Sequence, residues 1–404
     1  MPVIKTLAIA NYRSIRDLAI ELHGLDVVTG ANGSGKSSLY RALRLLAECA
    51  GGDSGNVVGS LARDGGLAST LWAGPESISE AMRRGEVPVQ GTVRRDSVNL
   101  KLGYSGDDFG YLVDLGMPVS SGAGFDQETG RARPSAFSLD PEIKREQIFS
   151  GPVARPGSLL VDRKGSLAKL RGADGDWTEL SRRLDTFQSM LTEVSDQDRA
   201  PEVLRVRDSV RSWRFYDHFR TDAEAPARQA QLGTRTPVLH HSGKDLAAAL
   251  QTMREVGFER QLDAAVDHAF PGSHLGIAVS DGRFSVELRQ PGMLRPMKAA
   301  ELSDGTLRFL LLTAALLTPR PPELMVLNEP ETSLHVDLMP ALAGLIVQAS
   351  ANSQMIVVTH SESLLGALRE SGAAHEHELY KDLGETRIKG LGSLEGPLWS
   401  WPKR

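Results

Sequence analysis

The sequence predicts an α/β fold in which a mostly parallel sheet is flanked by helices, with an antiparallel β region and a helical insertion. Two observations predict this class. An apolar strand over Leu25–Thr29 runs into glycines and then into a helical pattern over Ser37–Cys49, which is a strand–turn–helix unit. The last third of the chain alternates helix and strand, and this order is typical of parallel, doubly wound sheets. Its segments are Gly305–Leu317, Leu324–Asn328, Val336–Ala349, Gln354–Thr359 and Glu362–Arg369.

The composition is that of an ordinary globular protein. The 404 residues, 41% hydrophobic and 24% charged, are enough for two or three average domains or for one elaborated domain. A net charge of −5 gives no general attraction for nucleic acid, so any such contact must come from a local patch. The single cysteine, Cys49, suits a reducing compartment. Neither a signal peptide nor an apolar run of about 20 residues is found, and we expect a cytoplasmic protein with no membrane partner.

The strongest motif is the segment Gly30–Ser37, which matches G-x-x-x-x-G-K-[ST] in full. Glycines let backbone N–H groups turn inward, and the following helix directs its positive N-terminus at phosphates. Lys36 would reach the β and γ oxygens of a nucleotide, and the Ser37 hydroxyl would ligate Mg²⁺. A chance match is rare, about one in a hundred, and the strand and helix context is present, so the motif predicts nucleotide binding.

Two further strands end in polar residues. Leu324–Leu327 is apolar and is followed by Asn328 and Glu329, and a second apolar strand ends at His360. Open α/β sheets bind ligands at such strand ends. A carboxylate there can position an attacking water, and a neutral histidine can donate to a phosphate or to that water. Taken alone, the acidic strand end is equally compatible with a solvated turn, and an isolated strand-end histidine is more often structural. Their occurrence with a phosphate loop reverses that preference and favours a catalytic role.

These residues together resemble the ABC-type ATPase heads of the RecF/SMC class, most closely the RecF-like AAA ATPases that have no long coiled coil. Five blocks occur in the order found in that family, and the resemblance spans both ends, about half of the chain, leaving Gly85–Pro237 largely unassigned. The blocks are Asn11–Ile15, Gly30–Ser37, Leu302–Thr306, Leu327–His335 and Thr359–His360.

The resemblance implies a P-loop NTPase fold of the ABC type, with ATP and Mg²⁺ as ligands and an ATP-dependent homodimer that sandwiches two ATPs. Catalytic roles fall on Glu329 as base, His360 as switch histidine and Lys36; Ser37 and Asn328 would serve the metal, and His335 lies in the loop that crosses between protomers. The residues implied to bind ATP are Arg13, Gly30, Ala31, Asn32, Gly33, Ser34, Gly35, Lys36, Ser37, Ser38, Ser303 and Gly305. Ser303 and Gly305 would touch the γ-phosphate held by the partner, and a Ser-x-Gly at a helix start is itself suited to anions. If this block stood alone, a simple helix cap would be the favoured interpretation of Ser303.

Two positions depart from the family pattern. Asn328 stands where ABC proteins usually have aspartate, and its amide oxygen can accept from a metal-bound water without supplying the charge that favours Mg²⁺. Asp304 replaces a glycine that is common in transporter relatives. The metal-sensing glutamine of the family has several candidates in the insertion and is not assigned.

We divide the chain into three segments. Residues 1–84 form the N-terminal part of the ATPase core, residues 85–237 a β-rich and then helical insertion, and residues 238–404 the C-terminal part of the core. Within the insertion we expect an exposed loop over Gly116–Pro134, a helical stretch from about Glu179 to Arg211, and a polar linker over Thr221–Pro237.

The leading functional hypothesis is an ATP-hydrolysing switch whose heads close on ATP and reopen after hydrolysis, acting in DNA repair, chromosome maintenance or phage defence. The alternative, motivated by Asn328, is an ATP-binding sensor with little or no hydrolysis. A transporter subunit is less favoured because the chain lacks an LSGGQ sequence, and a nuclease because no clustered acidic metal site follows His360.

DNA or a partner protein is a further expected ligand. Arginines with interleaved aromatic residues suit phosphate contact and base stacking, but acidic residues share the stretch, so a solvated, salt-bridged helix is the favoured alternative. The arginines and aromatics are Arg199, Arg205, Arg207, Arg211, Trp213, Arg214, Phe215, Tyr216 and Arg220.

Overall fold

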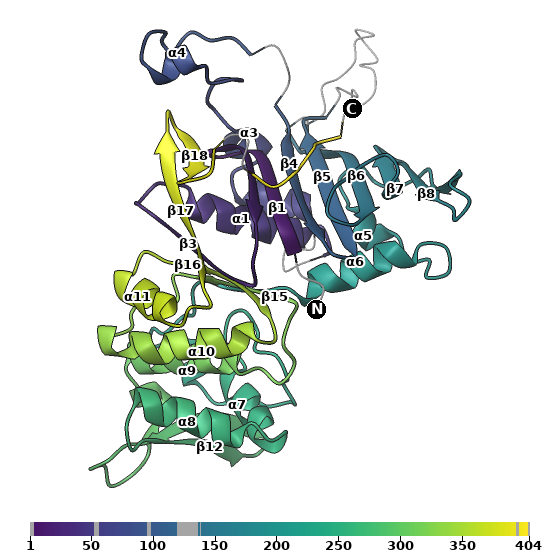
Figure 1. Ribbon diagram of the computed structural model, residues 1–404. Coiled ribbons are helices and arrows are strands. Elements are labelled where there is room, and N and C mark those ends of the chain that lie inside the picture. The colour runs from purple at the N-terminus through teal and green to yellow at the C-terminus, as the bar shows by residue number, and fades with distance from the viewer. Residues whose placement is uncertain are drawn as a thin grey trace. The chain divides into compact units, whose positions relative to one another are not determined.

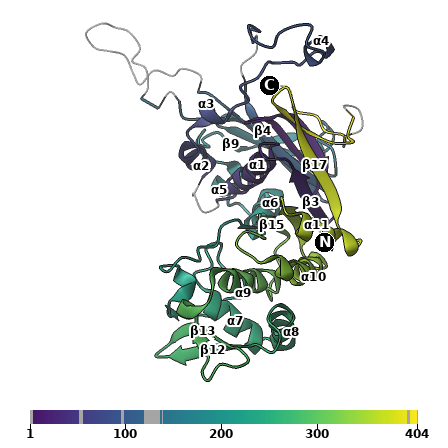
Figure 2. The same ribbon diagram turned by 90° about the vertical axis from the view of Figure 1, so that its left-hand side faces the viewer.

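The computed structural model describes residues 4–51, 56–94, 98–118, 136–137, 139–392 and 396–402. The chain forms two compact units that interleave along the sequence (Figure 1, Figure 2). The first unit takes residues 1–23, 30–212 and 378–404, and the second takes residues 24–29 and 213–377. Most of the loop expected over Gly116–Pro134 lies outside the described residues.

The first unit is built on an antiparallel sheet. In the described part of the chain this sheet has eight strands in the order β2-β1-β4-β5-β6-β7-β8-β9, and every neighbouring pair is antiparallel. From β4 to β9 each strand lies beside the next one in the chain, as in a meander. The strands are β1 (Ile4–Tyr12), β2 (Ile15–Glu21), β4 (Leu100–Gly106), β5 (Phe109–Gly116), β6 (Glu142–Ser150), β7 (Leu159–Lys164), β8 (Leu167–Arg171) and β9 (Trp177–Ser181).

Helices cover this sheet. The helix α1 contacts β1 and β4, and α6 contacts β5 and β6, as the strands and helices of the upper part of Figure 1 show. The inward side of α1 is apolar at intervals of three and four residues, with Leu39, Leu43 and Leu46 fully buried, as a helix against a sheet requires. The helices are α1 (Lys36–Glu48), α2 (Val57–Arg63), α3 (Leu67–Thr70), α4 (Glu80–Arg83), α5 (Met190–Glu193) and α6 (Pro201–Ser212).

The helical stretch expected from about Glu179 to Arg211 is wrong in its first half. Residues 177–181 form strand β9, α5 is a single turn, and a longer helix begins only at Pro201. Residues 195–199 are exposed and offer no apolar face for packing, while Pro201 suits the first turn of a helix because its missing N–H has no partner to lose there.

The second unit contains the parallel sheet. Four strands pair in parallel in the order β10-β15-β16-β3, and β17 lies next to β3. From Glu378 on, β17 belongs to the first unit, where it pairs antiparallel with β18. The strands are β3 (Leu25–Gly30), β10 (Arg214–Tyr216), β15 (Leu324–Asn328), β16 (Gln354–Val358), β17 (His375–Asp382) and β18 (Glu385–Ile388).

Helices and a small antiparallel sheet complete the second unit. Its core joins the parallel strands to the leucine-rich helices α9 and α10, which lie side by side in Figure 1 and Figure 2. The helices are α7 (Leu246–Glu255), α8 (Glu259–Ala269), α9 (Asp304–Leu316), α10 (Met339–Ser350) and α11 (Glu362–Glu370), with 3₁₀ turns η1 (Pro226–Arg228), η2 (Ala299–Glu301) and η3 (Val336–Leu338). The small sheet holds β11 (Gln231–Leu232), β12 (His274–Ser280), β13 (Arg283–Arg289) and β14 (Met297–Lys298).

The α/β class is confirmed, but the mostly parallel sheet is not. In the described residues, β10, β15, β16 and β3 pair in parallel, and the larger sheet is antiparallel. Short turns can join only antiparallel neighbours, whereas parallel strands need a crossover, and β4 to β9 are mostly joined without helices. In the described part of the chain no helix is long and apolar enough to cross a membrane.

Candidate functional site

The phosphate loop lies between β3 and α1. Strand β3 ends at Gly30 and α1 begins at Lys36, so the loop delivers the N-terminus of a 13-residue helix. The Lys36 side chain is buried, and its Nζ donates to the carbonyl oxygens of Gly30 and Ala31, the latter at 3.2 Å. The cation is therefore held within the ring of backbone that would surround a phosphate.

A strand from the other end of the chain supports this loop. Thr386 of β18 is buried, and its Oγ1 donates to the Ser34 carbonyl at 2.8 Å. Gly35 has a φ of +114°, and a Cβ there would lie 2.1 Å from Thr386 Oγ1. A side chain at position 35 is thus excluded both by backbone conformation and by Thr386. Sequence reasoning missed Thr386, since a single threonine about 350 residues from the loop carries no motif.

The hydroxyl groups of the loop fit phosphate and metal ligands. Ser37 is exposed at the start of α1, where its oxygen is available to a cation such as Mg²⁺. Ser34 Oγ is buried and has no hydrogen-bond partner within the described residues. A buried hydroxyl without a partner is unfavourable, and a phosphate oxygen would satisfy it. Ser38 Oγ lies 3.5 Å from Ser14 Oγ, at the β1–β2 turn.

Arg13 occupies that same β1–β2 turn with a φ of +51°. Its guanidinium pairs with Asp64 Oδ2 at 3.1 Å, and the neighbouring Tyr12 hydroxyl donates to the same oxygen at 3.1 Å. Burial raises the pKa of Tyr12 to about 12, so the phenol stays protonated and keeps donating. Ser14, next to Arg13, contacts Ser38 of the helix that follows the loop, while the Arg13 side chain itself is held by Asp64.

In the second unit, Glu329 follows β15 in an unusual backbone conformation. Its φ is +50°, a left-handed value that non-glycine residues adopt rarely and mainly where surrounding contacts enforce it. The Glu329 N–H donates to Val358 O at 2.7 Å, which ties the turn to the neighbouring strand β16. The kink leaves the carboxylate 42% exposed at the carboxyl end of a buried strand.

Arg308 of helix α9 holds the other side of this turn. It is only 2% exposed, and its Nη2 donates to the carbonyl oxygens of Glu329 at 3.0 Å and Asp217 at 3.2 Å. Burial lowers the pKa of Arg308, and the nearby carboxylates of Glu331, Asp217 and Glu329 oppose that shift. The helix that begins beside Ser303 is thereby bonded directly to the backbone of the predicted base.

His360 and Glu329 approach each other from adjacent strands. His360 Nδ1 lies 3.6 Å from Glu329 Oε1 and equally far from Glu331 Oε1. Glu331 is 8% exposed and accepts from the Thr359 hydroxyl and from the His360 backbone N–H at 3.1 Å. Glu331 therefore fixes the loop that carries the histidine. Sequence reasoning passed over it because Glu329, two residues earlier, was assigned as the catalytic base.

Asn328 is the last residue of β15. Its Oδ1 is buried and has no hydrogen-bond partner in the described part of the chain. An unpaired buried acceptor fits a metal-bound water, which is the role predicted for this position, and the neutral amide supplies no charge to it. The residues present are thus compatible with Mg²⁺ held by oxygen ligands.

Ser303 is the N-cap of α9. It is exposed, and its Oγ accepts from the Thr306 N–H at 3.1 Å, so the capping role considered from the sequence is present. Gly305 packs so closely on the loop after Glu329 that a Cβ would lie 2.9 Å from Ser333 O. His335, further along that loop, is exposed and caps η3.

The predicted site residues therefore fall into two groups. Gly30–Ser38 and Arg13 belong to the first unit, whereas Ser303, Gly305, Asn328, Glu329 and His360 belong to the second. Within the second unit Glu329 and His360 are brought together, and α9 is linked to them through Arg308. The metal-sensing glutamine stays unassigned; one candidate, Gln147, is buried and donates to Asp162 Oδ1 at 2.8 Å.

The arginine-rich stretch considered for DNA is largely engaged in internal contacts. In the first unit, Arg211 Nε donates to Ala50 O at 2.7 Å and Arg207 pairs with Asp208. In the second unit, Tyr216 is buried and its hydroxyl donates to Leu239 O. These contacts favour the salt-bridged alternative over a stacking surface.

Comparison with known proteins places the site in a family. A family model described as "AAA domain, putative AbiEii toxin, Type IV TA system" matches residues 27–366. The chain is similar to a structure of an Smc head bound to the C-winged helix domain of ScpA, at 12% identity and a TM-score of 0.48, covering 96% of this chain and 97% of that one.

Two further structures are similar. One is the SMC head domain from Thermotoga maritima, at 15% identity and a TM-score of 0.41, covering 96% of this chain and 98% of that one. The other is a Smc head domain with an extended coiled coil bound to the C-terminal domain of ScpA, derived from Pyrococcus furiosus, at 12% identity and a TM-score of 0.47, covering 96% of each chain. No curated protein matches the sequence. The family match confirms the expected AAA family, while a RecF-type head in particular stays a prediction.

Proposed function

Because the chain belongs to the AAA-domain family described as putative AbiEii toxins of type IV TA systems, we propose that it binds ATP with Mg²⁺ and hydrolyses it, and that ATP drives two copies together. The observation that carries this proposal is the Glu329–His360 pair. A phosphate loop alone supports binding, whereas a carboxylate 3.6 Å from a histidine at the end of a buried strand supports hydrolysis.

In this proposal the loop residues bind and orient the nucleotide. The N–H groups of Gly33 to Ser38 and the N-terminus of α1 would surround the phosphates, and Lys36 would exchange its carbonyl contacts for β and γ oxygens. Bound Mg²⁺ would neutralise developing charge on the phosphates. Ser37 would hold it directly, and Asn328 would accept from one of its waters.

Glu329 would orient and deprotonate the attacking water, and His360 would donate to the γ-phosphate or to that water. The left-handed turn at Glu329 supports this role, because its backbone is held from two sides by Val358 and Arg308, which fixes the point from which the carboxylate extends. Fixed geometry of this kind is how enzymes gain from positioning.

Ser303 and the N–H groups of the first turn of α9 would receive the γ-phosphate held by a second copy. Their exposure supports a contact in trans, because an exposed helix start is free to meet a partner. The resulting switch would act on DNA or on a partner protein, in DNA repair, chromosome maintenance or phage defence.

A phosphate-release assay tests hydrolysis. We expect turnover by the unaltered chain, loss of turnover in Lys36→Ala because nucleotide binding fails, and a decrease of roughly 10²- to 10⁴-fold in Glu329→Gln because the base is lost. Lys169→Ala, an exposed lysine on β8, is the control and should turn over normally. Turnover that survives in Glu329→Gln would contradict the assignment of the base.

The sensor alternative is supported by Asn328, whose neutral amide favours Mg²⁺ less than a carboxylate does. The same assay separates the two functions. A chain that binds ATP tightly but releases no phosphate above the Lys36→Ala background is a sensor.

A further inference from the structure

Arg228 is a buried cation in the segment expected from the sequence to be a polar linker. Its side chain is 7% exposed, at the end of the 3₁₀ turn η1. A buried charge is strongly unfavourable unless it is paired and its hydrogen-bonding groups are satisfied. The hydrogen-bond partners of Arg228 therefore indicate which segments the residue holds in place.

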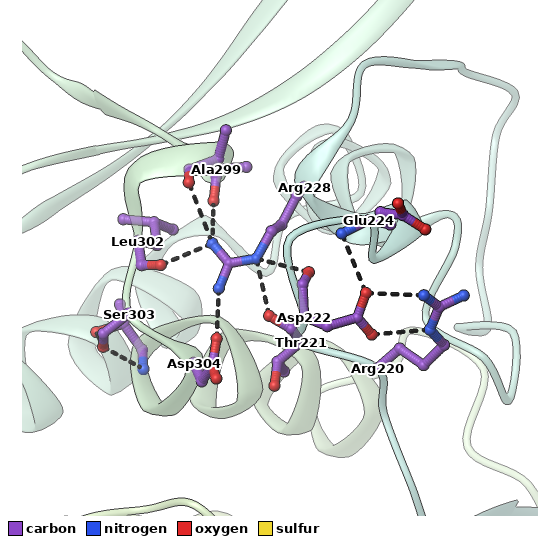
Figure 3. A network of polar contacts seen from close by, with 11 residues as sticks. Arg220, Thr221, Asp222, Glu224, Arg228, Ala299, Leu302, Ser303 and Asp304 are labelled. Atoms are coloured by element: carbon purple, nitrogen blue, oxygen red, sulfur yellow. Dashed lines mark hydrogen bonds and ion pairs between the residues drawn. The ribbon is translucent and has the colours of Figure 1, made fainter.

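All three nitrogens of the guanidinium are bonded, and they join two separate segments (Figure 3). Nε donates to Thr221 O at 2.8 Å and Asp222 O at 3.1 Å. Nη1 donates to Leu302 O at 2.7 Å and Ala299 O at 3.0 Å, with a longer contact of 3.4 Å to Ala300 O. The rigid fork thus clamps the turn that leads directly into Ser303, and a lysine could not match so many acceptors in one plane.

The remaining contact is to a carboxylate. Nη2 donates to Asp304 Oδ1 at 2.6 Å, and in Figure 3 the Asp304 side chain points at the guanidinium. Asp304 is 61% exposed and is the first residue of α9, directly after Ser303. The negative charge of Asp304 therefore lies at the same helix start that would receive a phosphate.

The N-terminus of α9 and the Asp304 carboxylate have opposite effects on an anion. The N-terminus of a helix attracts phosphate, but a carboxylate in its first turn repels phosphate and competes for the same N–H groups. A guanidinium bonded to that carboxylate cancels its charge and holds it to one side. Where relatives have glycine at this position, no such compensation is needed.

We propose that Arg228 is a positioning residue for the γ-phosphate of ATP held by a second copy of the chain. It fixes residues 299–304 so that Ser303 and the start of α9 face the phosphate, and it cancels the charge of Asp304. The inference rests on the proposed ATP-driven association. It adds a residue outside the five blocks that carry the resemblance, together with a reason why an acidic residue is tolerated beside Ser303.

The test measures ATP-dependent association by light scattering in a Glu329→Gln background, with binding of a fluorescent ATP analogue as a second readout. Arg228→Met should weaken association by at least about tenfold and leave analogue binding by Lys36 and its loop unchanged. Arg220→Met is the matched control, because Arg220 lies on the same loop, is 54% exposed and pairs only with Asp222 within the contacts described. It should associate normally.

A double variant separates charge compensation from a purely structural role. Adding Asp304→Asn to Arg228→Met should restore part of the association, because the uncompensated charge is removed while the lost carbonyl contacts are not regained. Arg228→Lys keeps the charge without the fork and should fall between the unaltered arginine and methionine, which keeps the inference testable if the methionine variant unfolds.

Unchanged association of Arg228→Met overturns the inference, and so does a double variant that shows no recovery. These outcomes leave the proposed function intact, because the Glu329→Gln parent still associates with ATP. Failure of that parent to associate would instead overturn the proposed function, and the inference with it.

Discussion

Asn328 and Glu329 are adjacent in the chain but face different surroundings at the end of β15. The amide oxygen of Asn328 is buried without a partner in the described structure, whereas the Glu329 carboxylate is partly exposed and close to His360. The two residues at this strand end are thus suited to different roles. Glu329 would serve the water, and Asn328 would serve the metal without adding charge.

Asn328→Asp should therefore strengthen the binding of Mg²⁺. A carboxylate acting through a bound water adds on the order of 1 kcal/mol of attraction, so the Mg²⁺ concentration for half-maximal phosphate release should fall about fivefold. Titration of Mg²⁺ against turnover measures this. Asn352→Asp, the same change at an exposed position after α10, should have no effect, and an unchanged midpoint for Asn328→Asp would remove this residue from the metal site.

Residues of the site were predictable where a local pattern carried them. The phosphate loop, Glu329 and His360 each follow an apolar strand, so their places could be read from the sequence. Glu331, Thr386 and Arg228 could not be found in this way, because their contacts join segments separated by 28, 352 and 76 residues in the chain. Their roles depend on the folded arrangement alone.

At the level of elements, the turn between β3 and α1 depends on β18. Thr386 fills the space beside Gly35 and bonds to Ser34 and Ser14. The loop is thereby shaped by a strand from the C-terminal part of the chain as well as by its own glycines. Support of this kind keeps a binding loop in one conformation before the ligand arrives.

Replacing Gly35 tests this support. Gly35→Ala should weaken binding of a fluorescent ATP analogue by at least about tenfold, because the new Cβ displaces Thr386 as well as straining the backbone by about 1–2 kcal/mol. Gly24→Ala is the matched control: its φ of +115° is almost the same, but a Cβ there meets nothing within 4 Å. It should lower the melting temperature without changing the dissociation constant. Equal analogue binding by the two variants would contradict the role of Thr386.

In the last third of the chain, the helices and strands from α9 to α11 were predicted closely, although α10 begins at Met339 rather than Val336, and β17 and β18 were not predicted. Strand β15 covers Leu324–Asn328 as expected, and α9 begins one residue before the predicted start. Long apolar periods decide these segments. The exposed strand β9 and the acid-rich residues before Pro201 lack such periods, and the long-range pairing of β1 with β4 leaves no local signal, so the antiparallel sheet was not anticipated at its full size.

For the whole molecule, the central feature is that the predicted site residues are divided between the two units. The first unit holds the complete phosphate loop, and the second holds Ser303, Asn328, Glu329 and His360. Within the second unit, α9 is connected to the catalytic turn through Arg308 and through the close packing of Gly305 on Ser333. A phosphate that binds at the start of α9 would therefore act on the same helix that holds Glu329.

Light scattering of the Glu329→Gln chain with ATP and Mg²⁺ tests the account most directly. We predict the mass of one chain with ADP and twice that mass with ATP, because only the γ-phosphate would bridge the loop of one copy and Ser303 of the other. Ser303→Arg should bind the nucleotide but keep the mass of one chain. A Glu329→Gln chain that binds ATP and stays a monomer, or that is a dimer irrespective of nucleotide, would contradict the ATP-driven switch.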